Sequence, residues 1–100
     1  MSTDLLPPVH PGEILREEFM RPLELSSNEV ARRLGITAAR VNEVASGRRG
    51  ITADTALRLS RLFNTSAEFW LNLQMRYELE VARRAVGRHI ELTVVAIDAH

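Results

Sequence analysis

The 100-residue sequence contains no cysteine, which excludes both a disulfide framework and a thiolate metal site. It has no apolar run close to the ~20 residues that a transmembrane helix needs. The N-terminus also lacks the basic start and long apolar stretch of a signal peptide. We therefore expect a cytoplasmic protein without a membrane partner. A chain of this length can bury one modest core, so a single domain is expected.

Lysine is also absent, and all 13 basic residues are arginine. The planar guanidinium suits phosphate and guanine better than an ammonium group does, although GC-rich codon usage would produce the same bias. The net charge of zero argues against a general polyanion binder. The charge is nevertheless uneven, because residues 26–63 hold seven arginines against three acids and both flanking segments are acidic.

Residues that could support catalysis or bind a metal are few. The sequence contains three histidines, His10, His89 and His100. They lack the spacing of metal ligands, so no metal and no other cofactor is expected. Ser26 and Ser27 have no nearby base, and helix capping accounts for them. We therefore expect a binding protein and not an enzyme.

Helical periodicity and capping signals predict an all-α domain of five helices. Pro11 suits the first position of a helix, and Pro22 ends that helix. Ser26 opens a capping box before the second helix, Gly35 ends it, and Thr37 caps the third. The expected helices cover about residues 11–21, 27–34, 38–45, 53–63 and 67–87.

Segments at both ends of the chain lie outside this helical domain of residues 10–87. Residues 1–9 have no periodicity and are expected to form an N-terminal arm. Residues 88–100 form a C-terminal tail, in which the β-branched stretch HIELTVVAI (89–97) predicts one short strand. A lone strand is not stable, so it would pair with a second copy or with another chain.

The long fifth helix has apolar residues on two opposite sides. One stripe consists of Phe69, Trp70, Leu73, Tyr77 and Val81. The other consists of Leu71, Met75, Leu79, Ala82 and Val86. A helix that is apolar on two sides must be buried on two sides. One stripe can cover the other helices, and the second needs either the C-terminal tail or a second subunit. We assign this second stripe, from Leu71 to Val86, to dimerisation.

Residues 26–47 have the spacing of a helix-turn-helix. Two short helices meet at Gly35, Ala31 occupies their close contact, and Val41 and Val44 point back to the core. This pattern predicts that the second of the two helices enters the DNA major groove. An all-α bundle with incidental helix pairing is the alternative.

The outer face of residues 38–45 would read the bases. Arg40 can fork onto guanine, Asn42 can pair with adenine, and Glu43 can accept from cytosine. Arg40 and Glu43 could also form a surface ion pair three residues apart. Ala38 and Ala39 would permit close approach and methyl contacts with thymine.

The expected phosphate contacts lie on either side of this helix. Ser26 and Ser27 start the second helix, where free N–H groups suit anions. Arg48 and Arg49 follow the third helix inside the positively charged segment. A solvated loop is the alternative for these two arginines.

Four stretches carry a resemblance to a known family: HPGEILREEF, LSSNEVARRLGIT, SGRRGITADTALRLSRLF and TSAEFWLNLQMRYELEVA. Together they cover about residues 9–84, and HPGE and EFWLNLQ are the distinctive parts. They resemble the HigA-type antitoxins, also called virulence-associated protein I or plasmid-maintenance antidote proteins. These are a branch of the lambda-repressor-like, XRE/Cro-type helix-turn-helix family.

The resemblance implies a five-helix DNA-binding domain that forms a homodimer and represses its own operon. Pairing through the long fifth helix would place two copies of the third helix about 34 Å apart on a palindromic operator. It also implies tight binding to a HigB/RelE-like toxin that cleaves mRNA. The base-reading positions that it implies are Thr37, Ala38, Ala39, Arg40, Asn42 and Glu43. The paired alanines depart from the more usual polar residues there. A stand-alone XRE-type repressor without a toxin partner is the alternative function.

Overall fold

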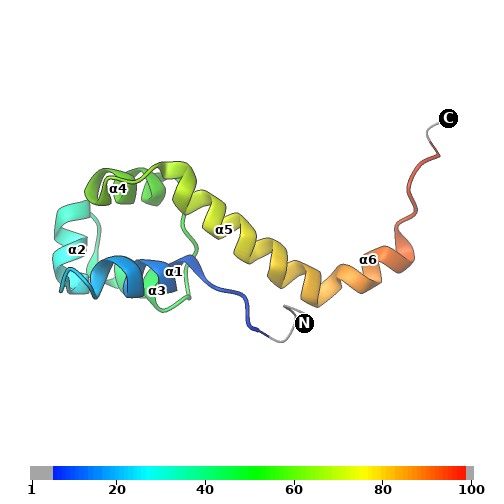
Figure 1. Ribbon diagram of the computed structural model, residues 1–100, viewed down its shortest axis with the longest axis horizontal. Coiled ribbons are helices and arrows are strands. Elements are labelled where there is room, and N and C mark those ends of the chain that lie inside the picture. Colours follow the sequence, from blue (N-terminus) through cyan, green and yellow to red (C-terminus); the bar gives the residue numbers. More distant parts are fainter. Residues whose placement is uncertain (1–5, 99–100) are drawn as a thin grey trace.

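The computed structural model describes residues 6–98, which form helices joined by short turns (Figure 1). The first five residues of the expected arm and the last two of the expected tail, including His100, lie outside this range. The elements are α1 (Pro11–Ile14), η2 (Leu15–Met20), α2 (Ser27–Leu34), α3 (Ala38–Ala45), α4 (Ala53–Phe63), α5 (Ala67–Ala82), η3 (Arg83–Gly87) and α6 (Arg88–Thr93). The segments η2 and η3 are wider π-helical turns that continue the helix before them. Counted as continuous runs, the described residues form five helices, which confirms the all-α fold class.

The helix-turn-helix elements begin and end where the sequence predicts. Ser26 Oγ accepts from the Glu29 N–H at 3.1 Å, and Thr37 Oγ1 accepts from the Arg40 N–H at 3.1 Å. Gly35 has φ of 73°, the left-handed conformation that a glycine adopts without strain. Only half of the predicted capping box forms, because the Glu29 carboxylate bonds Arg32 and Arg33 instead of reaching back to Ser26.

The core lies where helices α1 to α4 meet the start of α5, and we call this part the head. Trp70 of α5 is fully buried at its centre, and its indole N–H donates to Thr65 Oγ1 at 2.8 Å. Rings of Phe19, Phe63 and Phe69 surround it at centroid distances of 5.1, 6.4 and 5.0 Å. The first predicted stripe of α5 therefore packs on the head through Trp70 and its neighbours, whereas Val81 at its far end is exposed.

The HPGE motif brings α1 against α3 and α5. His10 Nδ1 accepts from the Gly12 N–H at 2.8 Å and so caps α1. The His10 ring meets the Tyr77 ring of α5 edge-on, with centroids 4.7 Å apart. A Cβ atom on Gly12 would lie only 1.7 Å from the carbonyl oxygen of Val44, so α1 approaches the α3 backbone closely. Glycine is required at this contact.

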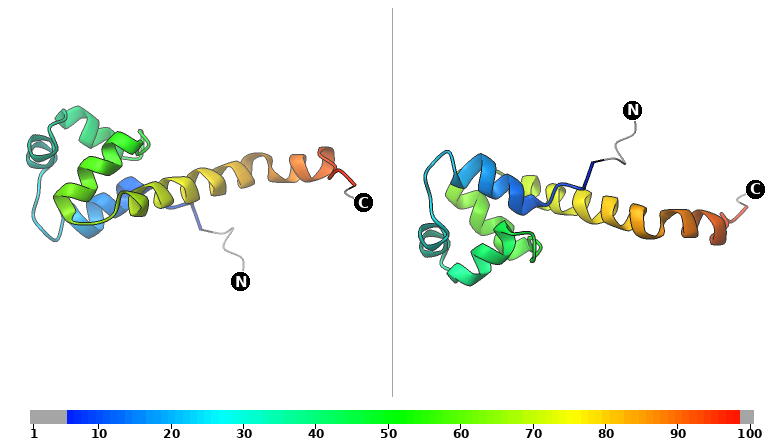
Figure 2. Two further views of the ribbon diagram at one scale, coloured as in Figure 1. Left: turned by 90° about the horizontal axis from the view of Figure 1, so that it is seen from above. Right: turned by 90° about the horizontal axis from the view of Figure 1, so that it is seen from below.

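Helices α5, η3 and α6 form one continuous helix that leaves the head as a rod (Figure 2). Its apolar side chains become exposed beyond the head, among them Met75, Leu79, Val86 and Ile90. The overall extents of the chain are 54 × 30 × 23 Å, and the rod accounts for the long dimension. Within the described residues, no helix is long and apolar enough to cross a membrane.

The predicted strand over residues 89–97 is wrong. Residues Arg88–Thr93 form helix α6, and residues 94–98 have no regular secondary structure. Gly87 has helical angles, φ −56° and ψ −48°, so the predicted helix end at Gly87 does not occur either. Thr93 Oγ1 donates to the His89 carbonyl at 2.8 Å within the last turn. Continuing an existing helix adds backbone hydrogen bonds at once, whereas a strand in a single chain has no neighbour to pair with.

Candidate nucleic-acid interface

Helix α3 has the inner and outer faces that its sequence predicts. Val41 and Val44 are buried, whereas Ala39 and Asn42 are exposed. Thr37, at the start of the helix, is exposed as well. The outer face of α3 therefore offers a small apolar group and an amide to a ligand.

The two alanines do not share one environment. Ala38 is half-buried and packs against the core, whereas Ala39 faces outward. Rotation about the helix axis separates neighbouring residues by about 100°, which accounts for the difference. Ala39 therefore offers its whole methyl group to a ligand, whereas Ala38 offers only the part that the core leaves exposed.

Arg40 bonds to α4. Its Nη2 donates to Thr55 Oγ1 at 2.6 Å and to Asp54 Oδ1 at 3.3 Å, and 27% of the side chain is exposed. Its Nε is buried and has no partner among the described residues. The surface ion pair of Arg40 with Glu43 does not form, because Glu43 pairs with Arg49 at 3.2 Å.

Asp54 connects α3, α4 and the end of α2. Besides Arg40, it accepts from Arg58 Nε at 2.8 Å. Arg58 Nη1 in turn donates to the Leu34 carbonyl, at 2.8 Å, in the last turn of α2. The hydrogen bond from Arg58, followed by the one from Arg40, lowers the pKa of the Asp54 carboxyl. This network fixes α3 relative to α2 and α4.

The predicted phosphate contacts lie in two separate places, at the start of α2 and in the turn after α3. Ser26 and Ser27 start α2, where the Ser26 hydroxyl is already used for capping and the first N–H groups remain for an anion. Arg48 and Arg49 are exposed in the turn after α3, which Gly47 makes with φ of 82°. Arg48 Nε donates to Ser46 Oγ at 3.0 Å. Both arginines can reach solvent on the side where α3 ends.

Two residues that hold the interface in place were not predicted from the sequence. Arg16 Nη1 donates to the Ala45 carbonyl at 2.6 Å and so satisfies the C-terminus of α3. The buried Gln74 Oε1 accepts from the Ile51 N–H at 2.7 Å, before α4. Both bonds join residues far apart in the sequence, so no local pattern could have indicated them.

The predicted dimerisation stripe lies along the exposed side of the rod. Leu71 packs partly against the core, and Met75, Leu79, Ala82 and Val86 are exposed. A groove of about 680 Å³ runs beside this stripe, lined by Ile51, Leu71, Gln74, Met75, Glu78, Leu79 and Ala82. No described residue covers the exposed part of the stripe.

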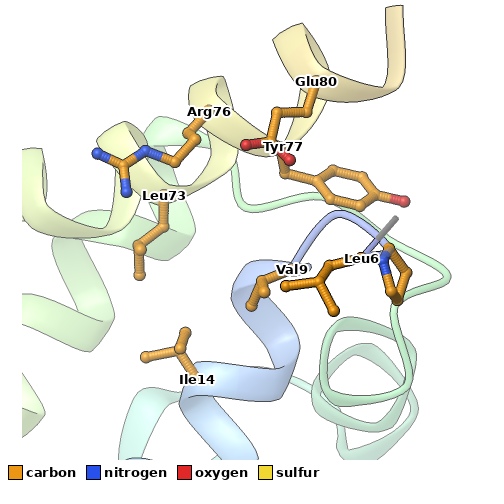
Figure 3. A pocket seen from close by; sticks show the side chains of 8 residues that line it. Leu6, Val9, Ile14, Leu73, Arg76, Tyr77 and Glu80 are labelled. Atoms are coloured by element: carbon orange, nitrogen blue, oxygen red, sulfur yellow. The ribbon is translucent and has the colours of Figure 1, made fainter. Parts of the chain in front are cut away.

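A second hollow lies between the arm and α5. Figure 3 shows Leu6 and Val9 of the arm on one side of a pocket of about 370 Å³, with Leu73 and Tyr77 of α5 across it. Arg84 Nη2 donates to the Leu6 carbonyl and holds the arm along the rod. Among residues 6–98, no group of three or more His, Asp or Glu side chains could hold a metal ion.

The arrangement of α2, α3 and the left-handed turn between them is that of a helix-turn-helix protein. Comparison with known proteins gives the same class. A helix-turn-helix family model matches residues 15–70. Virulence-associated protein I of Dichelobacter nodosus is 49% identical, over 79% of this chain and 73% of that protein.

Two solved structures indicate the family within the helix-turn-helix class. The structure of the Pseudomonas aeruginosa antitoxin HigA with the higBA promoter has a TM-score of 0.88 and 46% identity, covering 91% of this chain and 99% of that one. The antitoxin GraA in complex with its operator has a TM-score of 0.88 and 44% identity, covering 94% and 95%. The chain belongs to the HigA antitoxin family of helix-turn-helix proteins.

Proposed function

We propose that this protein is the DNA-binding antitoxin of a type II toxin–antitoxin system and represses its own operon. The observation that carries the proposal is the exposed outer face of α3 on a helix-turn-helix frame, with the exposed Arg48 and Arg49 directly after the helix. The HigA and GraA structures, which contain promoter or operator DNA, support it. Because its operator is chromosomal or plasmid DNA, the protein acts in the bacterial cytoplasm.

The side chains that read the bases differ in whether they are already bonded within the protein. Asn42 is exposed and can pair with adenine, and Ala39 can contact a thymine methyl group. Arg40 can reach guanine only by exchanging its bonds to Thr55 and Asp54 for the base. Thr37, Ala38 and Glu43 complete the base-reading set, at the start and the edge of the same face.

Phosphate contacts then fix the position of α3 on the duplex. The N–H groups at Ser26 and Ser27 bind one phosphate region, and Arg48 and Arg49 bind another. Since the whole chain has no net charge, these contacts give weak binding to DNA of unrelated sequence.

The protein binds a palindromic operator as a homodimer. The stripe from Leu71 to Val86 pairs two copies, since a monomer leaves its exposed apolar residues in water. Two α3 helices then lie about 34 Å apart, one helical turn of DNA.

The second binding activity is neutralisation of a HigB/RelE-like, mRNA-cleaving toxin encoded beside this gene. The support for it is the family, since the HigA and GraA relatives are described as antitoxins. Neither activity requires a catalytic group or a cofactor from this chain.

The test is a gel shift on the DNA upstream of the gene, combined with co-purification of the neighbouring gene product. We expect a specific shift with the protein alone and a stable complex with the neighbour, which loses its ribonuclease activity. Asn42→Ala should reduce the shift, whereas the matched control Asn72→Ala, exposed on α5, should not. A shift without toxin binding would support the stand-alone repressor instead, and no shift would overturn the proposal.

A further inference from the structure

The large apolar residues of the stripe from Leu71 to Val86, with its continuation into α6, are arranged symmetrically about Ala82 and Arg83. The exposed Val81 and Leu92 lie on other sides of the helix and are not part of this stripe. Leu79 and Val86 lie at equal distances in sequence on either side of this point, and so do Met75 and Ile90. Leu71 and Val94 form a third such pair. Each large apolar residue of the stripe thus has a counterpart on the opposite side of a small central alanine.

The π-helical turns of η3 keep these residues on one line. In an α-helix, residues four apart drift slowly around the axis, because one turn holds 3.6 residues. The wider turns over Arg83–Gly87 hold more residues per turn, so Val86 and Ile90 stay in line with Ala82. Val86 and Ile90 are both exposed, and Figure 2 shows the rod continuing without a break.

We propose that two copies of this chain pair antiparallel along the rod, with a two-fold axis at Ala82–Arg83, and that residues 94–97 of each copy fill the groove beside Ile51 of the other. The inference rests on the proposed homodimer and deepens it, because it states which face pairs, in which direction and in which register. An isologous contact of this kind requires a self-complementary surface, which the symmetric stripe provides.

The groove and the tail support the antiparallel direction. The groove of about 680 Å³ lies at the head end of the rod and includes Leu71. Val95 and Ile97 follow the opposite end of the rod, and their side chains are 85% and 92% exposed. About 11 residues separate Leu71 from the axis, and about 11 separate the axis from Val94, or ~17 Å each at 1.5 Å per residue. An antiparallel pair therefore brings the tail of one copy to the groove of the other. A parallel pair would leave both unoccupied.

The same register separates the two DNA-binding heads by about the distance between successive major-groove half-sites. Trp70, which anchors the rod in the head, lies about 12 residues from the axis, or ~19 Å. The two Trp70 residues are then ~38 Å apart, close to the ~34–36 Å between successive major-groove half-sites on one side of B-DNA. A parallel pair would instead put both heads at the same end of the rod.

Cysteine cross-linking tests the register directly, because the natural sequence contains no cysteine. Under mild oxidation, Ala82→Cys alone should form a disulfide-linked dimer, and Met75→Cys with Ile90→Cys in one chain should do the same. Met75→Cys alone should stay monomeric on a denaturing gel, since its own copy lies ~22 Å away and a disulfide needs Cα atoms within ~7 Å. Cross-linking by Met75→Cys alone, or failure of both predicted pairs, would overturn the register.

A second variant tests the tail without cross-linking. Ile97→Asp should raise the dimer dissociation constant at least tenfold in sedimentation experiments, whereas Leu23→Asp, an exposed leucine on the head, should not. An unchanged dissociation constant for Ile97→Asp would overturn the tail assignment. The outcome is separable from the proposed function: operator binding with the wrong cross-links refutes only the register, and correct cross-links without operator binding refute only the DNA-binding role.

Discussion

Replacing Gly12 by alanine tests how closely α1 approaches the recognition helix. The new Cβ atom would lie 1.7 Å from the Val44 carbonyl oxygen and 2.8 Å from its carbon, both backbone atoms of a packed helix. Side-chain movement cannot relieve such a contact, so α1 must shift. Overpacking in a core costs about 1–3 kcal/mol and occasionally more. Loss of the His10 cap adds about 1 kcal/mol, so we expect a total of about 2–4 kcal/mol.

Urea unfolding at a fixed protein concentration measures this cost. With a typical slope of about 1–3 kcal/mol per M, the midpoint should fall by about 1–4 M. Gly87→Ala is the matched control, because Gly87 has helical angles and its new Cβ atom would meet only Arg83 Cβ, at 3.8 Å. The control should stabilise the protein by about 0.4–1 kcal/mol. A Gly12→Ala variant as stable as the natural protein would refute the close packing of α1 on α3.

Other variants test the titration of His10 and the two kinds of DNA contact. Burial lowers the pKa of His10 below its usual 6.5, so its contribution to stability is complete above that pH and is lost as the pH falls below it. The urea midpoint should therefore decrease from pH 7.5 to 5.5, and His10→Asn, which keeps a capping oxygen but does not titrate, should flatten this decrease. Arg40→Ala should weaken operator binding by about 1–3 kcal/mol and relax specificity at one base, whereas Arg48→Ala should weaken all sequences alike and reduce the salt slope by about 1. Equal specificity profiles of these two variants in a binding-site selection would contradict the assignment. Thr55→Val removes the acceptor that Arg40 must leave, so it should strengthen operator binding a few-fold in a titration; a loss as large as that of Arg40→Ala would mean that Arg40 acts by holding α3.

Local signals were sufficient to predict the helix-turn-helix. The Thr37 cap and the buried spacing of Val41 and Val44 depend on residues within one or two turns, and α3 has the predicted bounds Ala38–Ala45. The capping hydrogen bonds of Ser26 and Thr37 and the left-handed conformation of Gly35 also occur as predicted.

Contacts between distant residues were not predictable in this way. The outer position of Arg40 indicated a base reader, but its partner Thr55 lies 15 residues away on another helix. Likewise, the Ala45 carbonyl is bonded by Arg16, 29 residues away. The β-branched composition of residues 89–97 predicted a strand, and the continuing helix overrode that local preference.

The fold also distinguishes the two apolar stripes of α5. Periodicity identified both stripes of α5, but only the fold shows that Trp70 and Tyr77 meet the head while Met75 and Leu79 do not. The remaining exposed stripe is what the proposed dimer has to cover.

The most direct test of the account is the operator affinity of Asn42→Ala compared with the natural protein, on the DNA upstream of the gene at one salt concentration. Asn42 is exposed on the outer face of α3 and has no structural bond that its loss would break among those described. If α3 reads the operator, the variant should bind about 5- to 150-fold more weakly, as expected for the loss of one amide–adenine pair worth about 1–3 kcal/mol. Equal affinity of the two proteins for this DNA would contradict the assignment of α3 as the reading helix.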